Sequence, residues 1–249
     1  MKNILLLICF AAVLAYAAPM GHFDKVSGNW LVNNGRFSCS FLEGSMFPGD
    51  FTFSDGSTPG IILFRDTITG ADKKVYALFE ERWAETRIVQ NDENTFIIER
   101  TGAFFRNANP VITQLKGVTA TCRYEFHKNV PQMKMKFTFK KEKALTCRIN
   151  SCMFLNWYAA NPFAYIVSGK KQENFIPLPG QKLRNWDTGN ELALKNRTFT
   201  VTLKADRCIA TIIPGGLFPC RLNGGFWQYP WNGETMLEKE AVLRLERIQ

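Results

Sequence analysis

The chain of 249 residues is poor in the groups from which recognisable catalytic and metal sites are built. It has two histidines, His22 and His127, and no C-x-x-C pair, so zinc binding and thioredoxin-like chemistry lack their usual ligands. No catalytic motif stands out, and apolar residues almost nowhere recur at the spacing of an amphipathic helix. We therefore predict no metal site, no cofactor and few or no helices after the N-terminal segment.

Apolar runs long enough to cross a membrane are also absent. The one continuous apolar run covers 4–14, after Lys2 and before the small-x-small sequence at 15–17. A spanning helix needs about 20 apolar residues, whereas a basic start, a short apolar segment and a small-residue cleavage site define a secretory signal peptide. We predict a signal peptide over 1–17, a secreted or periplasmic mature chain over 18–249, and no integral membrane segment in that mature chain.

Acidic residues are fewer than basic ones, and the formal net charge is +9. Loss of Lys2 with the signal peptide lowers the charge to +8, because 1–17 hold no acidic residue. A basic protein suits anionic glycans, a membrane surface or nucleic acid, although a basic surface without a partner is also common. Export and the lack of a nucleic-acid-binding signature argue against nucleic acid.

Export permits disulfides among the cysteines that remain after the signal peptide: Cys39, Cys122, Cys147, Cys152, Cys208 and Cys220. We predict a bridge between Cys208 and Cys220, because they flank a turn at 212–217. Cys147 and Cys152 are an unfavourable pair, since five extended residues span about 16 Å and a bridge needs Cα atoms within about 7 Å. Buried thiols are the alternative for several of the six.

Strand signals recur along the whole chain, with turn residues between them. No linker or composition shift divides the chain, so we predict a single all-β domain over 18–249, built as a large antiparallel β-sandwich. Single helical turns are expected at 80–85 and 235–240. The predicted strands are 36–42, 50–53, 60–64, 73–79, 85–90, 95–101, 118–127, 132–139, 145–155, 199–203, 208–213, 225–229 and 241–248.

The segment 122–135 has the clearest two-residue period and carries a family resemblance. Its Tyr-x-Phe strand, short turn with Pro131 and alternating apolar strand are similar to a hairpin of galactose-mutarotase-like super-sandwich domains. Such domains occur in aldose epimerases and in many glycosidases and polysaccharide lyases. The opening at 30–37, followed by Gly44, also resembles the start of these domains. The resemblance extends over 30–248 in layout, and it implies a sugar-related scaffold.

The epimerase active site does not carry over, because no histidine stands in a motif like the catalytic motif of that family. The resemblance therefore does not imply mutarotase activity.

The C-terminal third contains an aromatic run that is the main candidate for sugar binding. Trp227, Tyr229 and Trp231 alternate along an extended chain and would share one face, and Gln228 and Asn232 supply amides. Flat rings that contact sugar C–H groups, with amides on the hydroxyls, make the usual form of such a pocket. The alternative is a core-facing aromatic ladder, which large sandwiches also need.

A second candidate site lies in the polar stretch 169–190, which we expect to form a long loop. Trp186 would offer a ring, and Arg184 would pair with the carboxylate of a uronic acid as a bidentate fork. The alternative is an exposed loop with an ordinary ion pair between Arg184 and Asp187.

Catalysis is not excluded by the residue types present. A polysaccharide lyase needs a base and a group that holds the substrate carboxylate, and His127, Tyr158 and Arg184 are of suitable types. No spacing singles out the carboxylate pair of a hydrolase. The leading prediction is a poly- or oligosaccharide-binding protein that favours anionic glycans. A lyase or hydrolase on such glycans and a structural or assembly protein of the cell envelope remain alternatives, and the sequence leaves the oligomeric state open.

Overall fold

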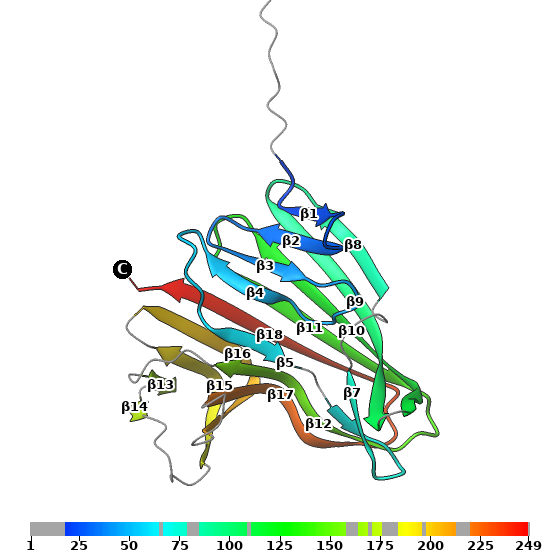
Figure 1. Ribbon diagram of the computed structural model, residues 1–249. Coiled ribbons are helices and arrows are strands. Elements are labelled where there is room, and N and C mark those ends of the chain that lie inside the picture. Colours follow the sequence, from blue (N-terminus) through cyan, green and yellow to red (C-terminus); the bar gives the residue numbers. More distant parts are fainter. Residues whose placement is uncertain are drawn as a thin grey trace, which may run out of the picture.

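A computed structural model describes residues 18–64, 67–78, 85–108, 111–157, 164–168, 171–175, 184–195, 198–212 and 220–248. These parts of the chain form β-strands and contain no helix, as the sequence predicts (Figure 1). Consequently none of them includes a helix that could cross a membrane.

The strands are β1 Gly21–Asp24, β2 Asn29–Asn33, β3 Phe37–Phe41, β4 Gly49–Phe53, β5 Ile61–Phe64, β6 Thr67–Thr69, β7 Val75–Leu78, β8 Glu85–Asn91, β9 Thr95–Ala108, β10 Val111–His127, β11 Gln132–Lys141, β12 Cys147–Trp157, β13 Ala164–Ser168, β14 Lys171–Phe175, β15 Arg184–Lys195, β16 Phe199–Ile212, β17 Cys220–Trp231 and β18 Met236–Arg247.

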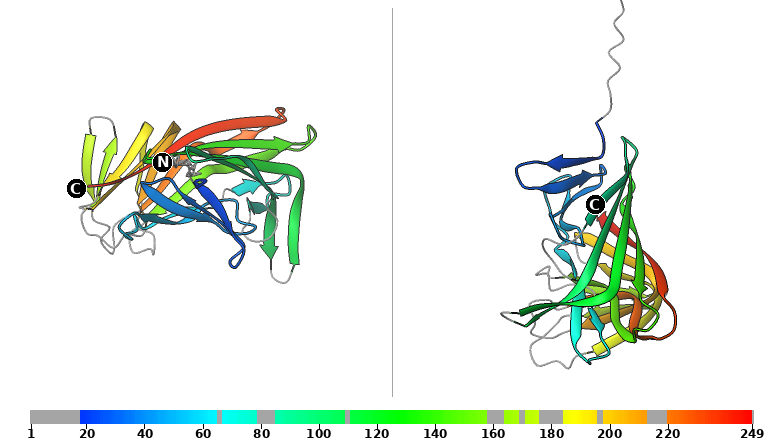
Figure 2. Two further views of the ribbon diagram at one scale, coloured as in Figure 1. Left: turned by 90° about the horizontal axis from the view of Figure 1, so that it is seen from above. Right: turned by 90° about the vertical axis from the view of Figure 1, so that its right-hand side faces the viewer.

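A small antiparallel sheet has the order β1-β2-β3-β4. Because side chains alternate between the two faces of a strand, its inner face carries apolar residues such as Val32, Phe37 and Phe41, which are buried. Its outer face carries polar residues such as Asn33 and Ser38. The small sheet packs against one part of a much larger sheet (Figure 2).

The large sheet is antiparallel and curls strongly. Its main path runs β14-β13-β15-β16-β17-β12-β6-β7-β9-β10-β11-β18, with β5 paired to β12 and β8 paired to β9. A further pairing joins β16 to β18, from Phe199 opposite Arg247 to Ala205 opposite Ala241. The sheet therefore returns on itself between these two strands, and its concave side encloses apolar side chains.

The core between the two sheets is rich in aromatic rings. Phe41 of the small sheet contacts Tyr124 at 5.1 Å and Phe126 at 6.2 Å between ring centroids, both edge-on. The Tyr124 hydroxyl is satisfied because it donates to the Met46 carbonyl at 2.8 Å. Burial of one Phe side chain stabilises a fold by about 1.5–3 kcal/mol, so these rings stabilise the packing of the two sheets.

The predicted hairpin at 122–135 is present with the expected alternation. Tyr124 pairs with Met135 and Phe126 with Met133 across β10 and β11, and all four side chains are buried. Both strands continue beyond the predicted bounds, since β10 begins at Val111 and β11 ends at Lys141.

Three sequence predictions about irregular or divided segments need revision. The expected helical turn at 235–240 is wrong, because β18 begins at Met236 and pairs with β11 from there. The expected long loop at 169–190 is also wrong, since it includes β14 and the first half of β15. The two strands predicted at 199–213 are one continuous strand, β16. The predicted turn at 80–85 lies outside the described residues, apart from Glu85, where β8 begins.

The predicted disulfide between Cys208 and Cys220 is wrong. Cys208 lies opposite Gly224, whereas Cys220 lies opposite Ile212. The two cysteines are therefore four residues apart along the strand direction, about 13 Å, well beyond the reach of a bridge. Four cysteines of the described chain carry buried thiols: Cys39, Cys122, Cys147 and Cys208.

Candidate functional site

A groove of about 790 Å³ opens where the end of β18 meets two turns and the end of β4. The β2–β3 turn contributes Gly35 and Arg36, and the β10–β11 turn contributes Pro131. Phe53 at the end of β4 and Ser54 just after it line the groove, and 244–248 line it from β18 and beyond. Its volume lies within the range of about 300–1,000 Å³ that is usual for ligand sites.

The two turns are held together by Asn34, which is only 1 % exposed. Its Oδ1 accepts hydrogen bonds from the backbone N–H groups of Arg36 and Phe37, both at 3.0 Å. Its Nδ2 donates to the Val130 carbonyl at 2.9 Å, and its own carbonyl accepts from the N–H of Asn129 at 2.6 Å. A buried amide with all of these bonds fixes where the β2–β3 turn sits on the β10–β11 turn.

Arg36 is positioned by the same pair of turns. Its Nε donates to the Asn129 carbonyl at 3.1 Å, while its side chain remains exposed. Among the described residues no carboxylate forms a salt bridge with Arg36, so its terminal nitrogens are available to a ligand.

Two further arginines face the groove from β18. Arg244 forms a salt bridge with Glu246 at 2.7 Å, and Arg247 forms one with Asp55. Hydrogen bonds from the side chain and backbone of Ser57, with a smaller contribution from Arg247, hold the pKa of the Asp55 carboxyl below its ordinary value. The guanidinium groups of the three arginines are therefore offset by only two carboxylates, those of Glu246 and Asp55, which leaves one net positive charge at the groove.

Phe53, which lines the groove, belongs to a stacked aromatic pair. Phe53 stacks on Phe199 with ring centroids 5.2 Å apart and planes within 5° of parallel. Both rings are largely buried, with 7 % and 9 % exposed, so Phe53 gives the groove an apolar wall that is backed by Phe199 rather than an open stacking platform. Guanidinium groups beside such a wall suit a carboxylate or sulfate group, which the planar fork binds with two hydrogen bonds.

The predicted aromatic run lies on β17, and the structure describes part of its surroundings. Trp231 is fully buried, with 0 % exposed. Tyr229 is half-buried against the core, and its hydroxyl donates to Glu234 at 3.3 Å. Asn232 is exposed just beyond the strand. A core position of Trp231 agrees with the alternative of an aromatic ladder, and ligand binding by this run stays a prediction.

The remaining candidates of the run are placed by their backbone alone. Trp227 pairs with Ser151 of β12, and Gln228 follows it along β17. Trp186 of β15 pairs with Ala210, which in turn pairs with Leu222. Because Leu222 and Trp227 are five residues apart, the Trp186 position is about 16 Å from Trp227 along the strands.

The catalytic candidates are not brought together by the described structure. His127 lies at the end of β10, with its Nε2 2.6 Å from Glu125 Oε1 and its Nδ1 3.3 Å from Thr95 Oγ1. Arg184 begins β15 and pairs with Ile212 of β16. Tyr158 lies outside the described residues, and a role in catalysis for any of the three stays a prediction.

Sequence reasoning missed all three arginines of the groove. Arg36 is more than two hundred positions from Arg244 and Arg247 in the chain, and no motif links them. The excess of basic residues was the only signal, and it does not indicate where basic side chains gather.

Comparisons with known proteins find a similar fold within solved structures of glycosidases. No family model matches the chain, and no curated protein matches it. A solved structure with a similar fold is the GH36 α-galactosidase AgaB of Geobacillus stearothermophilus, with a TM-score of 0.65, 9% identity, and coverage of 91% of this chain and 41% of that protein.

Two further solved structures extend this likeness. AgaA, a GH36 α-galactosidase of the same organism, gives a TM-score of 0.63 at 10% identity, over 88% of this chain and 40% of that protein. An α-mannosidase of Enterococcus faecalis gives 0.57 at 9% identity, over 87% of this chain and 29% of that protein. The chain thus spans less than half the length of each protein, and identities this low establish the fold alone.

Proposed function

We propose that the protein is an exported carbohydrate-binding domain that holds an acidic poly- or oligosaccharide in the groove between β4 and β18. The observation that carries this proposal is the meeting of Arg36, Arg244 and Arg247 around one groove with net positive charge. The fold likeness to glycosidase domains supports a sugar ligand. The net charge of the chain supports an anionic one.

The kind of β-sandwich and the export of the protein are part of the same proposal. We infer that the sandwich is of the galactose-mutarotase-like kind, on the basis of the 122–135 hairpin and the curled antiparallel architecture. Export is inferred from the signal peptide predicted at 1–17. N-terminal sequencing of protein recovered outside the cytoplasm should then begin at Ala18, and a retained Met1 would contradict export by this route.

The test compares a charged and an uncharged form of one polymer. The mature chain, 18–249, is run in native gels that contain either dextran sulfate or dextran, with polygalacturonate as a carboxylate-bearing polymer. We expect retardation by the acidic polymers only, and less retardation as salt is added, because exposed charges are screened within about 10 Å at 0.1 M salt.

Three substitutions in the groove separate a specific site from a generally basic surface. The variant Arg36→Gln/Arg244→Gln/Arg247→Gln should bind the acidic polymer about 10-fold more weakly or worse, equal to ~1.4 kcal/mol. The matched control is Lys73→Gln/Lys116→Gln/Lys143→Gln, which removes the same charge from exposed positions at the other end of the strands.

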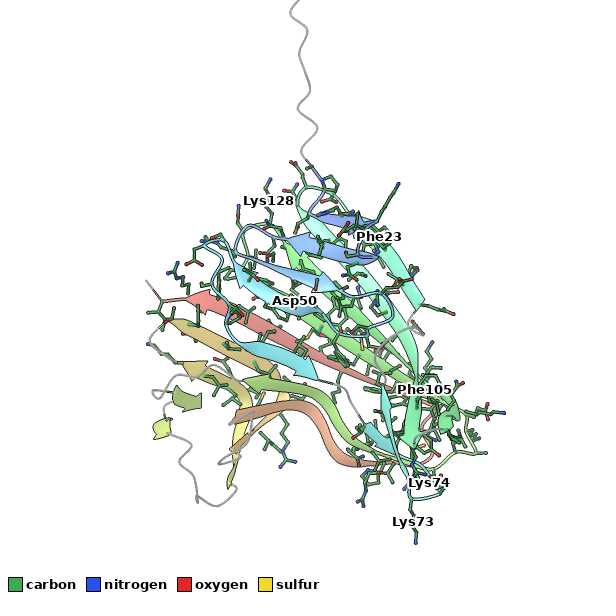
Figure 3. The ribbon with its side chains drawn as sticks, in the orientation of Figure 1. Phe23, Asp50, Lys73, Lys74, Phe105 and Lys128 are labelled. Atoms are coloured by element: carbon green, nitrogen blue, oxygen red, sulfur yellow. The ribbon has the colours of Figure 1, made fainter. Side chains whose placement is uncertain are left out.

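The control positions are remote from the groove. The β10–β11 pairing places Val118 opposite Lys141 at one end of the hairpin and Phe126 opposite Met133 at the other. Lys116 and Lys143 lie beyond the first end, about 30 Å along the strands from the turn that reaches the groove, and Lys73 lies at that same end of the molecule (Figure 3). Equal weakening in both variants would contradict a site in the groove.

The two alternative functions, an enzyme that acts on glycans and an assembly protein of the cell envelope, predict different results in the same assay. Release of unsaturated or reducing ends from the polymer would show an enzyme. Self-association with no binding and no product would favour an envelope or assembly protein, and would overturn the proposed function.

A further inference from the structure

The outer face of the small sheet contains a second hollow, separate from the arginine groove. It has a volume of about 380 Å³ and is lined by residues of all four strands. One row across the sheet consists of His22, Leu31 and Ser40, which pair in sequence across β1, β2 and β3. Asn33 and Ser38 form the adjacent row. The hollow lies on the face of the sheet that carries the exposed side chains of Asn33 and Asp50, away from the core; Asp50 is labelled in Figure 3.

Two asparagines of β2, Asn29 and Asn33, line this hollow and use their amide oxygens in backbone contacts. Asn29 Oδ1 accepts the backbone N–H of Glu43 at 3.1 Å, and Asn33 Oδ1 accepts the backbone N–H of Gly35 at 2.9 Å. A backbone N–H can only donate, so the amide oxygen must face it and the NH₂ group must point elsewhere. Within the described structure neither NH₂ group has an acceptor, and both side chains line the hollow.

Asp50 supplies the acceptor on the opposite side of the hollow. Its Oδ2 accepts a hydrogen bond from Ser40 Oγ at 2.6 Å, which leaves Oδ1 without a donor in the described chain. Asp50 has a φ of 53°, a left-handed conformation that costs most non-glycine residues about 1–2 kcal/mol. The β3–β4 register also shifts between Ser38 and Ser40, and together these features direct an exposed carboxylate toward the hollow.

The groups around the hollow are balanced between donors and acceptors and carry little charge. The two amide NH₂ groups donate, Asp50 Oδ1 accepts, and the exposed His22 ring can do either. Leu31 is half-buried at the centre of the row and offers an apolar patch. With one carboxylate and no arginine or lysine among its lining residues, the hollow does not suit an anion.

We propose that this hollow binds an uncharged, hydroxyl-rich ligand, namely a neutral mono- or disaccharide unit. Each sugar hydroxyl both donates and accepts, so it can pair with an asparagine NH₂ group and with Asp50 at once, while a C–H face of the ring covers Leu31. The volume lies near the lower end of the usual range for ligand pockets, about 300–1,000 Å³. The chemistry is complementary to that of the arginine groove, and the proposal does not depend on binding there.

Isosteric substitutions test the proposal with little effect on the fold. Asn33→Asp keeps the oxygen that accepts the Gly35 N–H but removes the NH₂ donor. Asp50→Asn keeps an acceptor for Ser40 and a residue type that tolerates positive φ, but removes the carboxylate. His22→Gln changes an exposed side chain that no backbone bond requires. Asn190→Asp, at an exposed position on β15, is the matched control for the change of charge.

Binding is measured by saturation-transfer NMR and calorimetry with galactose, glucose, mannose and their methyl glycosides. At least one of these should bind the unaltered protein, and Asn33→Asp and Asp50→Asn should each weaken binding about 10-fold, as expected for one hydrogen bond to a partly charged or charged partner. Asn190→Asp and the triple arginine variant should bind the neutral sugar as the unaltered protein does.

Two results would overturn the proposal. One is that no neutral sugar binds the unaltered protein. The other is that Asn33→Asp, Asp50→Asn and His22→Gln bind the sugar with unchanged affinity, although thermal unfolding shows that all three variants are folded. If one variant fails to fold, the other two decide. Retardation by acidic polymers is measured in parallel, so loss of one activity without the other shows which of the two sites is wrong.

Discussion

At the scale of single residues, the most unusual feature is a lysine that points into the core. Lys141 ends β11 on its inner face and is 6 % exposed, and its ammonium lies 5.4 Å from the centre of the Trp231 ring. Within the described residues, neither its Nζ nor Trp231 Nε1 has a hydrogen-bond partner. Arg100, a second buried cation of the described residues, is better satisfied. It donates to Thr86 Oγ1 at 2.6 Å and to the Leu42 carbonyl at 2.7 Å, and only its Nε lacks a partner there.

Replacement of this lysine should stabilise the protein. Burial of a charged group without an acceptor is costly, and the contact with the Trp231 ring, worth about 2 kcal/mol for a desolvated cation, offsets only part of that cost. We expect Lys141→Met to raise the free energy of unfolding by about 1–3 kcal/mol, as measured by urea denaturation. The exposed neighbour gives the control, Lys140→Met, which should change stability by less than about 0.5 kcal/mol. A loss of stability in Lys141→Met would show that the ammonium has a partner.

At the scale of elements, the outward face of β8, β9, β10 and β11 is joined by a ladder of ion pairs. Glu99 accepts from Arg87 at 2.6 Å and from Arg123 at 3.0 Å. Glu125 accepts from Lys134 at 3.1 Å and lies 2.6 Å from His127. Partial burial works against the charged form of each carboxylate, but the hydrogen bonds outweigh it and leave the pKa of both Glu99 and Glu125 below the ordinary value.

This ladder should make stability depend on acid pH. A carboxyl whose pKa is lower in the folded state contributes stability that is present above its unfolded pKa, about 4.3, and that is lost as pH falls through the lower folded pKa. In Glu99→Gln/Glu125→Gln we expect a loss of about 1–2 kcal/mol near neutral pH, and a shallower decline of stability below about pH 4. Urea unfolding across this pH range measures both.

The control for the ladder is Glu142→Gln. Glu142 is exposed and forms no ion pair within the described residues. In Glu142→Gln the free energy of unfolding should therefore decline in acid as it does in the unaltered protein. If the double variant kept the full decline of stability in acid, the ladder would not be its cause.

At the scale of the whole molecule, packing and strand pairing hold the fold, and no covalent bridge joins the cysteines whose side chains the structure describes. The pairing of β16 with β18 closes the curled sheet, and the small sheet covers its aromatic core. A chain of this length can bury a core large enough to be stable without disulfides. The four buried thiols therefore act as small apolar side chains.

The thiols should be unreactive in the folded protein and titratable after unfolding. Burial raises the pKa of the Cys39 and Cys147 thiols, and the thiolate is the reactive form. We expect alkylation without reductant to modify Cys39, Cys122, Cys147 and Cys208 only in denaturant, as detected by peptide mass spectrometry. A cross-linked peptide that contains Cys208 would contradict the structure, and recovery of all four as alkylated peptides would support it.

The sequence alone determined the fold class, because a two-residue apolar period needs only local information. The alternation of Tyr124 and Phe126 with polar neighbours predicts an antiparallel pair with one buried face, and the structure confirms it. Local pattern failed where pairing partners decide the outcome. The residues at 236–240 are a strand because β11 lies beside them, and Cys208 has no bridge because the register places Gly224 opposite it.

Both candidate sites were decided by tertiary structure. Arg36 meets Arg244 and Arg247 because Asn34 joins two turns that are far apart in the sequence. The hollow on the small sheet depends on strand register and on the left-handed conformation of Asp50. A ligand site needs side chains from several strands at defined distances, and those distances are set by long-range pairing that no local pattern encodes.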